Sequence, residues 1–515
     1  MLDNYIYNLG VMFEGIASQY ATKVAISFPG GDEITFAQLN HDANAIASLL
    51  KTKGIKKNDV CAIAGVKKRN TYSAFIACVK LGITYTFFDP ESPVDRLSKI
   101  LTQCSPKIIL GYMKEIEAFD SLNYFPTIDL GESEITLKIA EEVSVNQSDE
   151  EVEGSCPAYI MFTSGSTGFP KGAVMTHANL INFIQWGKQT FSITTKDIHT
   201  NVNPLYFDNS VFDLYCSLFN GATLVPVSKL ESINPRTLLQ ILKNNQCTTW
   251  FSVPSLLIYL QTTKAIIPEQ WSTVKKIIFG GEGYPKAKLI NLYNSLKHNT
   301  TLYNVYGPTE CTCICSSYEV GENDFIDLNG FLPLGKMAEN FTYYIVDERM
   351  KQSDEKGNLI LGGPNVGLGY FNDPIRTSER FIQNPFHHNY KDICYITGDL
   401  VSFNKAGNKI YIHGRTDNQI KHMGYRIELE EIENAICQLH YINEAAAFMI
   451  GDSNNNKIFA VYESSTEIDF KTMKDDLKKY LPGYMIPSEI HKIERIPKNA
   501  NGKTDRLSLQ KTYQN

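Results

Sequence analysis

The segment from residue 158 to residue 177 contains groups that could bind phosphate. An apolar run, Ala158–Phe162, leads into a loop of glycine and hydroxyl residues: Thr163, Ser164, Gly165, Ser166, Thr167 and Gly168. Glycines let backbone N–H groups turn toward an anion, and the ammonium of Lys171 adds positive charge. The pattern predicts a phosphate-binding loop. It is not a Walker A loop, because no Gly-Lys-Ser/Thr follows a Gly at the required offset.

Further motifs follow this loop in a fixed order along the chain. They are Tyr306–Glu310, Gly363–Pro374, Tyr395–Asp399, Gly414–Lys421, Gly424–Glu428 and Asn501–Arg506. Together with the loop, they resemble the adenylate-forming enzymes, which include acyl- and aryl-CoA ligases, luciferases and the adenylation domains of peptide synthetases. The resemblance covers nearly the whole chain. It implies an ATP-dependent ligase that forms an acyl-adenylate and then transfers the acyl group to a thiol.

The resemblance also implies roles in binding ATP and Mg²⁺. The glycine-rich loop is expected to hold the β- and γ-phosphates, Thr309 to contact the α-phosphate and Glu310 to bind the metal. The ring of Tyr306 is expected to stack on adenine, and the carboxylate of Asp399 to accept from both ribose hydroxyls. The remaining residues expected at the nucleotide are Gly281, Glu282, Gly283 and Arg415.

The C-terminal motifs imply a second, mobile part of the active site. Lys503 is expected to bridge the substrate carboxylate and the α-phosphate as the new bond forms. By resemblance, a small C-terminal domain swings about a hinge at Asp417, so that Lys503 leaves and the segment Lys421–Gly424 approaches. Gly424 would then line a tunnel for the thiol arm, although a turn glycine is the simpler interpretation.

The sequence Phe207-Asp208-Asn209-Ser-Val-Phe212 resembles the amino-acid-activating branch of the family. There, Asp208 would pair with the α-ammonium group of the substrate. A buried carboxylate is costly without a cation, which favours this interpretation. The alternative is structural, because Asp208 precedes an apolar periodic run and could cap a helix.

Transferred residue by residue, the substrate pocket is almost entirely apolar. Its walls would be Phe207, Asn209, Phe212, Phe251, Ile278, Gly280, Val305, Cys313 and Ile314. Such a pocket favours an aliphatic side chain, with depth provided by Gly280. Asn209 is the exception, and it either bonds a polar group of the substrate or faces away.

The predicted function is therefore amino-acid adenylation, followed by thioester transfer to a separate carrier protein with a phosphopantetheine arm. Since few residues follow Asn501–Arg506, the chain is either a free-standing enzyme or an excised domain, and its start at Met1 favours the first. D-alanine:carrier-protein ligases and acyl- or aryl-CoA ligases are the enzymatic alternatives. A non-catalytic ATP-binding scaffold is disfavoured, because the chain has all five polar residues expected for catalysis and nucleotide binding: Lys171, Glu310, Asp399, Arg415 and Lys503.

Composition restricts the class of protein further. With 49 Lys and Arg against 56 Asp and Glu, the net charge is −7, which argues against a nucleic-acid or anionic-membrane partner. The sequence contains neither an apolar run that could cross a bilayer nor a signal-peptide pattern. Eleven Cys in 515 residues do not form a disulfide scaffold, and we expect reduced thiols in the cytoplasm.

The pattern of apolar residues along the chain predicts an α/β protein with layered sheets, whose helices and strands would position these residues. Residues 5–20 predict a helix, and apolar runs such as Val60–Ala64 and Lys276–Gly280 predict strands of a parallel sheet. We expect a large N-terminal domain at 1–415 with a β-rich part after Gly330, a hinge at 416–418 and a mobile α+β domain at 419–515. Cys311, Cys313 and Cys315 alternate with other residues, which predicts that all three lie on one face of a strand. A zinc site is not expected, because the sequence shows no second pair of cysteines at zinc-binding spacing.

Overall fold

The computed structural model describes residues 6–514 except 121–124, 132–134, 136–147, 149–150, 166–167, 340, 354, 405–408, 452–455 and 499–503. The chain divides into two compact units. The first comprises residues 1–90, 104–161 and 172–414. The second comprises residues 91–103, 162–171 and 415–515, so two short segments from the N-terminal region pack with the C-terminal residues.

A nine-stranded sheet of described residues in the first unit contains several strands with residues predicted to line the substrate pocket. Its order is β15 (Lys336–Met337), β14 (Ser316–Glu319), β13 (Thr301–Tyr306), β12 (Lys276–Gly280), β11 (Thr249–Ser252), β9 (Ile198–Asn201), β10 (Thr223–Pro226), β1 (Val24–Ser27) and β2 (Glu33–Thr35). The strands from β13 to β1 run parallel. Their carboxyl ends therefore lie at one edge, where ligands of open α/β sheets bind.

A seven-stranded sheet forms the second layer. Its order is β18 (Gly369–Tyr370), β8 (Lys171–Thr176), β7 (Pro157–Thr163), β4 (Thr84–Phe88), β3 (Val60–Ala64), β5 (Ile108–Gly111) and β6 (Thr127–Asp129). Every residue of β3 and β4 is buried, in keeping with the continuous apolar sequence of β3. The strand predicted at residues 60–64 is thus confirmed.

A third, antiparallel sheet follows in the β-rich part that the sequence predicted after Gly330. Its order is β16 (Thr342–Val346), β17 (Lys356–Gly362), β20 (Ile393–Asn404) and β19 (Phe381–Gln383), with β21 (Lys409–Arg415) paired to β20.

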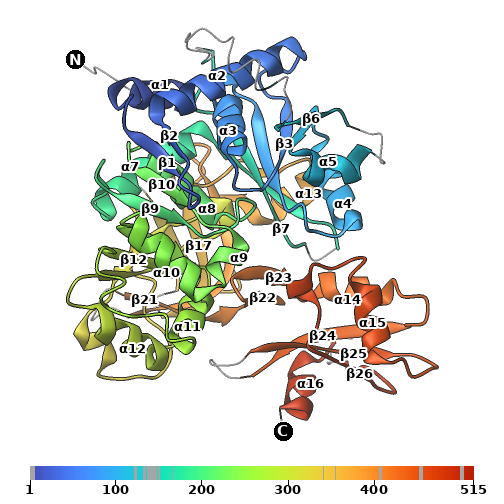
Figure 1. Ribbon diagram of the computed structural model, residues 1–515. Coiled ribbons are helices and arrows are strands. Elements are labelled where there is room, and N and C mark those ends of the chain that lie inside the picture. The colour runs from blue at the N-terminus through green and yellow to red at the C-terminus, as the bar shows by residue number, and fades with distance from the viewer. Residues whose placement is uncertain are drawn as a thin grey trace. The chain divides into compact units, whose positions relative to one another are not determined.

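Helices cover the sheets of the first unit, as Figure 1 shows for α1, α2 and α3. Side-chain caps define several helix starts: Asn8 accepts from two N–H groups of α1, and Thr35 and Thr176 form capping boxes. The helical segments are α1 (Leu9–Gln19), α2 (Phe36–Thr52), α3 (Arg69–Leu81), α5 (Met113–Asp120), α7 (His177–Thr190), α8 (Asn209–Val211), η1 (Phe212–Cys216), α9 (Lys229–Ser232), α10 (Pro235–Asn244), α11 (Pro254–Thr262), α12 (Lys286–Leu296), η2 (Thr309–Cys311), η3 (Glu322–Phe325) and α13 (Pro374–Arg380).

The second unit has its own small α+β core. A hairpin of β22 (Gln419–His422) and β23 (Tyr425–Glu428) precedes a three-stranded sheet with helices beside it. Its other elements are α4 (Val94–Cys104), α14 (Leu429–Cys437), β24 (Glu444–Ile450), β25 (Lys457–Glu463), α15 (Phe470–Leu477), η4 (Gly483–Met485), β26 (Glu489–Lys492) and α16 (Arg506–Tyr513). Ile432, Ala447 and Leu477 belong to its apolar core.

The predicted strand through the three alternating cysteines is wrong. Cys311 ends the 3₁₀ turn η2, and both Thr312 (φ 61°) and Cys313 (φ 69°) have left-handed backbone, so an extended run is impossible before β14. The turn packs against Gly307, where a Cβ atom would lie 2.3 Å from the Cys313 carbonyl oxygen. All three cysteines are nevertheless buried, as expected for small core residues.

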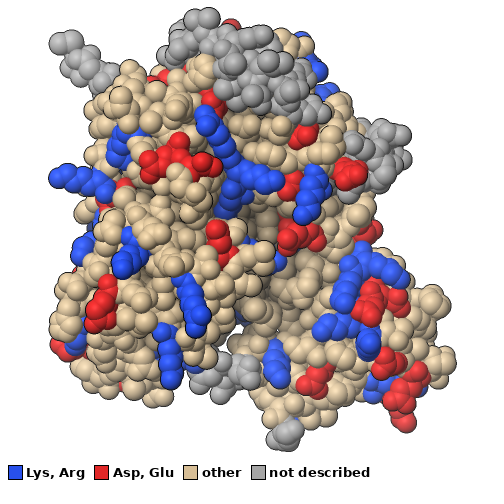
Figure 2. All heavy atoms as spheres, in the orientation of Figure 1, with Lys and Arg blue, Asp and Glu red and all other residues tan. Residues whose placement is uncertain are grey.

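The surface carries charges of both signs. On the face in Figure 2, Lys and Arg side chains lie among Asp and Glu side chains. None of the helices in the described part of the chain has both the length and the hydropathy that crossing a membrane requires.

Candidate active site

The adenosine residues predicted in the first unit lie together. The Tyr306 phenol, at the end of β13, donates to Asp399 Oδ2 on β20 over 2.5 Å, and both side chains are buried. Burial and then the negative charge of Asp399 raise the pKa of Tyr306 well above its usual range, so the phenol stays protonated. Asp399 is therefore held with its carboxylate oriented by a fixed donor.

Asp208 and Thr309 meet across the sheet edge, although they are 101 residues apart. The Thr309 hydroxyl donates to Asp208 Oδ2 over 2.5 Å. Asp208 occupies the position before α8, but its side chain makes no capping hydrogen bond. The helix-cap interpretation of Asp208 therefore fails, and the carboxylate lies against the residue predicted to contact the α-phosphate.

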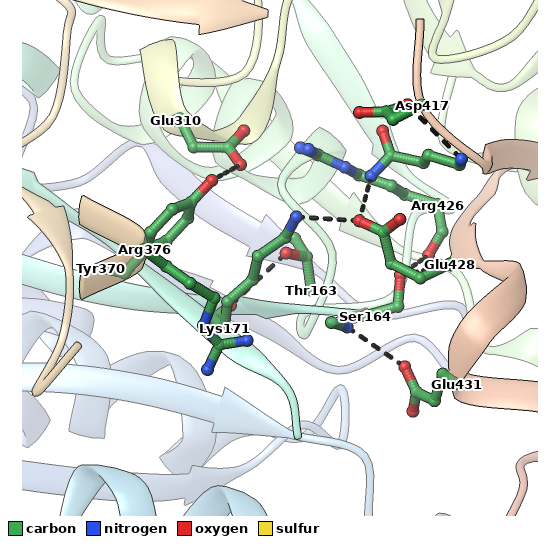
Figure 3. Close-up of polar contacts among 12 residues, drawn as sticks. Thr163, Ser164, Lys171, Glu310, Tyr370, Arg376, Asp417, Arg426, Glu428 and Glu431 are labelled. Carbon is green, nitrogen blue, oxygen red and sulfur yellow. Dashed lines mark hydrogen bonds and ion pairs between the residues drawn. The ribbon is translucent and has the colours of Figure 1, made fainter. Parts of the chain in front are cut away.

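Glu310 is fully buried in the adjacent turn. Its Oε1 accepts a hydrogen bond from the Tyr370 phenol over 2.7 Å, as Figure 3 shows, and its backbone carbonyl accepts from the Gly367 N–H. Tyr370 belongs to the motif Gly363–Pro374, but the sequence alone predicted no role for it. Its place within that motif was the one indication of a functional role.

The Gly281-Glu282-Gly283 segment leaves β12 with a positive φ of 90° at Gly281. Glu282 Oε1 accepts from the Ser255 N–H over 2.7 Å, which satisfies a donor in the first turn of α11. The predicted contact with the base edge therefore rests on the backbone of this segment. The Asn209 amide nitrogen lies toward Gly281, 3.7 Å from where a Cβ atom of that glycine would be.

Several predicted pocket walls are brought together by strand register. Phe251 on β11 pairs with Ile278 on β12, and Gly280 pairs with Val305 on β13. The rings of Phe212 and Phe251 pack edge to face with centroids 5.2 Å apart. The wall residues that are buried are Phe212, Phe251, Ile278, Gly280, Val305, Cys313 and Ile314, whereas Phe207, Asp208 and Asn209 are partly exposed.

The prediction that Gly280 provides depth is wrong. A Cβ atom at this position would lie 2.4 Å from the Val305 carbonyl oxygen and 2.6 Å from Val305 Cγ2. The glycine thus allows close approach of β12 and β13, and its missing side chain does not leave space for substrate.

In the second unit, the phosphate loop binds carboxylates. The Lys171 ammonium lies 2.9 Å from Glu428 Oε1 (Figure 3). The Gly165 N–H donates to Glu431 Oε2 over 3.3 Å. The Ser164 hydroxyl donates to the Arg426 carbonyl and accepts from the Glu428 N–H. Of the groups that the sequence assigned to phosphate, the Lys171 ammonium and the Gly165 N–H thus contact carboxylate oxygens, whereas the Ser164 hydroxyl donates to a neutral carbonyl.

The structure describes some of the other residues of the phosphate loop but not all of them. Thr163 donates to the Lys171 carbonyl over 3.4 Å, and Gly168 has a positive φ of 77°. Ser166 and Thr167, together with the proposed catalytic Lys503, lie outside the described residues.

Arg415, expected at the nucleotide, forms a bidentate pair with Asp417, the residue expected at the hinge. Arg415 Nε and Nη2 contact the two carboxylate oxygens of Asp417 at 2.7 and 2.9 Å. Lys421 lies on β22. Gly424 (φ 82°) and Met423 (φ 52°) form the turn to β23, so a glycine is explained here by hairpin geometry.

Comparison with known proteins assigns a family to this arrangement. The family described as AMP-binding enzyme matches residues 13–371, and the AMP-binding enzyme C-terminal domain matches residues 431–503. The chain belongs to the AMP-binding enzyme family. The family and the layered α/β fold predicted from the sequence are thereby confirmed.

Individual relatives agree with this assignment. The chain is 32% identical over 504 residues to bacitracin synthase 1 of Bacillus licheniformis, a match covering 97% of this chain and only 9% of that protein. The Vibrio cholerae adenylation domain AlmE, in complex with glycyl-adenosine-5′-phosphate, matches with TM-score 0.82 and 23% identity over 99% of both chains. An artificially fused adenylation–PCP di-domain from Klebsiella oxytoca, NpsA-ThdA, matches with TM-score 0.80 and 20% identity over 94% of both chains.

Proposed function

We propose that this AMP-binding enzyme adenylates an amino acid with ATP and transfers it as a thioester to the phosphopantetheine arm of a carrier protein. The observation that carries the proposal is the contact between Asp208 and Thr309. It joins a carboxylate suited to an α-ammonium group to a hydroxyl suited to the α-phosphate. An α-amino acid requires both contacts, because its amine and its reacting carboxylate are one carbon apart.

The surroundings of Asp208 support a cationic substrate group. Phe212 and Cys313, which belong to the expected pocket, are buried and carry no charge. The negative charge of Asp208 contributes, after burial, to a raised pKa of Cys313, which indicates that thiol and carboxylate are near one another. An acyl- or aryl-CoA ligase would have no amine to balance this charge.

The side-chain preference follows from the same residues. Phe251, Ile278 and Val305 are buried apolar groups on three neighbouring strands. We assign an aliphatic substrate to this pocket, with the stereochemistry left to experiment.

Glu310 fits the proposed Mg²⁺ ion. Mg²⁺ is bound in nucleotide sites through one or two carboxylates together with waters and phosphate oxygens, so a single buried carboxylate is sufficient protein ligand. Glu310 is fully buried and held by Tyr370. When bound, the ion would neutralise phosphate charge during displacement of pyrophosphate.

The other residues have complementary parts in the proposed reaction. Lys171 and the N–H of Gly165 would exchange their carboxylate partners for ATP phosphate oxygens. Asp399 would accept from the ribose hydroxyls, while Thr309 orients the α-phosphate. Lys503 would stabilise the charge that develops between carboxylate and phosphate. These steps give an aminoacyl-adenylate and pyrophosphate.

An ATP–pyrophosphate exchange panel tests the substrate class. The panel contains L- and D-amino acids, including alanine, valine, isoleucine and leucine, with fatty and aromatic acids as comparison substrates. We expect exchange with aliphatic amino acids and none with their deamino analogues. Equal exchange with deamino or fatty acids would establish the CoA-ligase alternative, and a sharp preference for D-alanine would favour a D-alanine:carrier-protein ligase.

Transfer to a carrier is tested by supplying one. A radiolabelled amino acid should load onto a separate holo-carrier protein and should not load onto the same carrier lacking its phosphopantetheine arm. Stable acylation of this chain, for instance at Cys313, would contradict the proposal. We also propose a cytoplasmic location.

Lys503→Ala separates the two half-reactions. If Lys503 stabilises only the adenylation transition state, the variant should lose pyrophosphate exchange while still transferring a supplied aminoacyl-adenylate to a thiol. The two rates are measured on one preparation, so a folding defect would reduce both. Near-normal exchange in the variant would overturn the assignment of Lys503.

A further inference from the structure

A buried polar network lies beneath the pocket walls and takes no part in the proposed chemistry. Asp213, immediately after the wall residue Phe212, accepts hydrogen bonds at Oδ2 from the side-chain amides of Asn201 and Asn203, each over 3.0 Å. All three polar side chains are at most 5% exposed. Asp213 Oδ1 is also buried and has no hydrogen-bond partner among the described residues.

The network connects the two aromatic walls of the pocket. The Asn203 amide that donates to Asp213 also donates to the backbone carbonyl of Phe251 over 3.0 Å. Phe251 lies on β11, whereas Asp213 lies in the π-helical turn η1 that begins at Phe212. One side chain thus fixes the turn carrying one ring relative to the strand carrying the other.

Two features show that this arrangement is specified rather than incidental. The η1 turn has π-helical hydrogen bonding, which is rare and frequently found at functional sites. A buried carboxylate is also costly: burial raises the pKa of Asp213 to about 7, even though both asparagines and nearby Lys67 act in the opposite direction.

The rest of the network anchors Asn201 to the surrounding fold. Its Oδ1 accepts from the Tyr72 phenol over 3.0 Å, and its backbone carbonyl accepts from the Lys67 ammonium. The same ammonium donates to the Val227 carbonyl over 2.7 Å, just beyond β10. The ends of β9 and β10 are therefore fixed, and Asn203 extends this rigid base to β11.

We propose that Asn203 is a positioning residue that sets side-chain selectivity, because it joins the turn bearing Phe212 to the strand bearing Phe251. The proposal rests on the pocket assigned under the proposed function. Without Asn203, the two rings would no longer be held at one separation, and the slot between them would accept side chains of different size more evenly. Contacts to ATP would be unaffected.

Asn203→Ala tests this inference, with Asn220→Ala as the matched control. Asn220 is also a buried asparagine whose amide donates to a backbone carbonyl of η1, that of Cys216, and its N–H donates to the Ser217 carbonyl; neither partner is a pocket-wall residue. We expect Asn203→Ala to change the ratio of kcat/KM for leucine over alanine by about tenfold, a size typical of apolar pocket discrimination. The KM for ATP should stay at its wild-type value.

The control should keep the wild-type selectivity even if its stability falls. An unchanged leucine-to-alanine ratio in folded Asn203→Ala, or an equal change in Asn220→Ala, would overturn the inference. If Asn203→Ala does not fold, Asn203→Ser replaces it, since the hydroxyl retains one hydrogen bond, and the same two criteria apply.

The design separates this inference from the proposed function. Failure of the proposed function is visible in the unchanged enzyme, as exchange driven by acids that lack an amine. In that case the variants are assayed with a long and a short member of the active acid class. An altered ratio in Asn203→Ala alone would still support the positioning role, and an unaltered ratio would remove it.

Discussion

Asp208 shows at the residue scale how a single carboxylate links two parts of a reaction. Its side chain accepts from Thr309 and makes no helix-capping bond, although it stands in front of α8. An α-ammonium group placed beside Asp208 would thus be adjacent to the residue that we assign to the α-phosphate. This contact would couple recognition of the amine to positioning of the reacting carboxylate.

Removing Asp208 should strongly impair amino-acid activation. In Asp208→Ala, the substrate ammonium would be bound without its counter-charge. Because Asp208 is partly exposed, the cost should lie below the roughly 3–5 kcal/mol of a broken, fully buried ion pair. We expect a loss of about tenfold to a hundredfold in kcat/KM for amino acids, since each 1.4 kcal/mol is about tenfold. Pyrophosphate exchange over a range of amino-acid concentrations measures it.

Asp208→Asn provides the control for this experiment. The amide oxygen can still accept from Thr309, but the charge is absent, so a comparable loss would assign the effect to charge. Full activity in both variants would contradict the ammonium role of Asp208.

At the scale of elements, the pairing of β12 with β13 decides what Gly280 does. Because a Cβ atom would meet the Val305 carbonyl, Gly280→Ala should destabilise the fold by about 1–3 kcal/mol through overpacking. Gly15→Ala is the control: apart from its chain neighbours and the backbone of α1 itself, no atom lies within 4 Å of its Cβ position, and helix propensity should stabilise the variant by about 0.5–1 kcal/mol. Urea unfolding measures both, and wild-type stability in Gly280→Ala would contradict the prediction.

The segment after β21 is the element that we propose as the hinge. Asp417→Pro fixes φ and removes a backbone donor there, so it should impair thioester transfer more than adenylation. Asp417→Ala removes the bidentate pair with Arg415 without restricting the backbone, and it should affect the two steps more evenly. Rates of pyrophosphate exchange and carrier loading are compared. An equal loss of both steps in folded Asp417→Pro would remove the hinge assignment.

At the scale of the whole molecule, buried histidines should limit stability in acid. His177 begins α7, is fully buried and accepts at Nδ1 from the Leu9 N–H over 3.2 Å. Burial lowers the pKa of His177 from 6.5 to about 4. Between these values the unfolded chain binds a proton that the native protein does not, so the free energy of unfolding falls as pH decreases from 6.5 toward 4.

This contribution of His177 amounts to about 3 kcal/mol at most, since one unit of pKa shift corresponds to about 1.4 kcal/mol. His177→Asn keeps an acceptor for Leu9 but does not titrate. Its unfolding free energy, from urea titrations between pH 4 and 7, should therefore depend less steeply on pH than that of the wild type. Burial lowers the pKa of His199 to about 3, so part of the slope should persist in the variant. Equal slopes would contradict the prediction.

The sequence by itself determined the family, the layered α/β fold and several strands of its sheets. These follow from local information: apolar runs of strand length such as residues 60–64, and motifs whose residues are close together in the chain. The pairing of Tyr306 with Asp399 was also anticipated in outline, because both lie in motifs assigned to adenosine.

Only the tertiary structure decided which atoms these residues meet. The partner of Asp208 is 101 residues away, and the partner of Glu310 is 60 residues away, so no local pattern identifies them. The role of Gly280 depends on the register of a neighbouring strand, and the cysteine run failed as a strand because two residues adopt positive φ. Hydrogen bonds, close approach and backbone strain depend on distances between segments, whereas periodicity and motif spacing are properties of the chain alone.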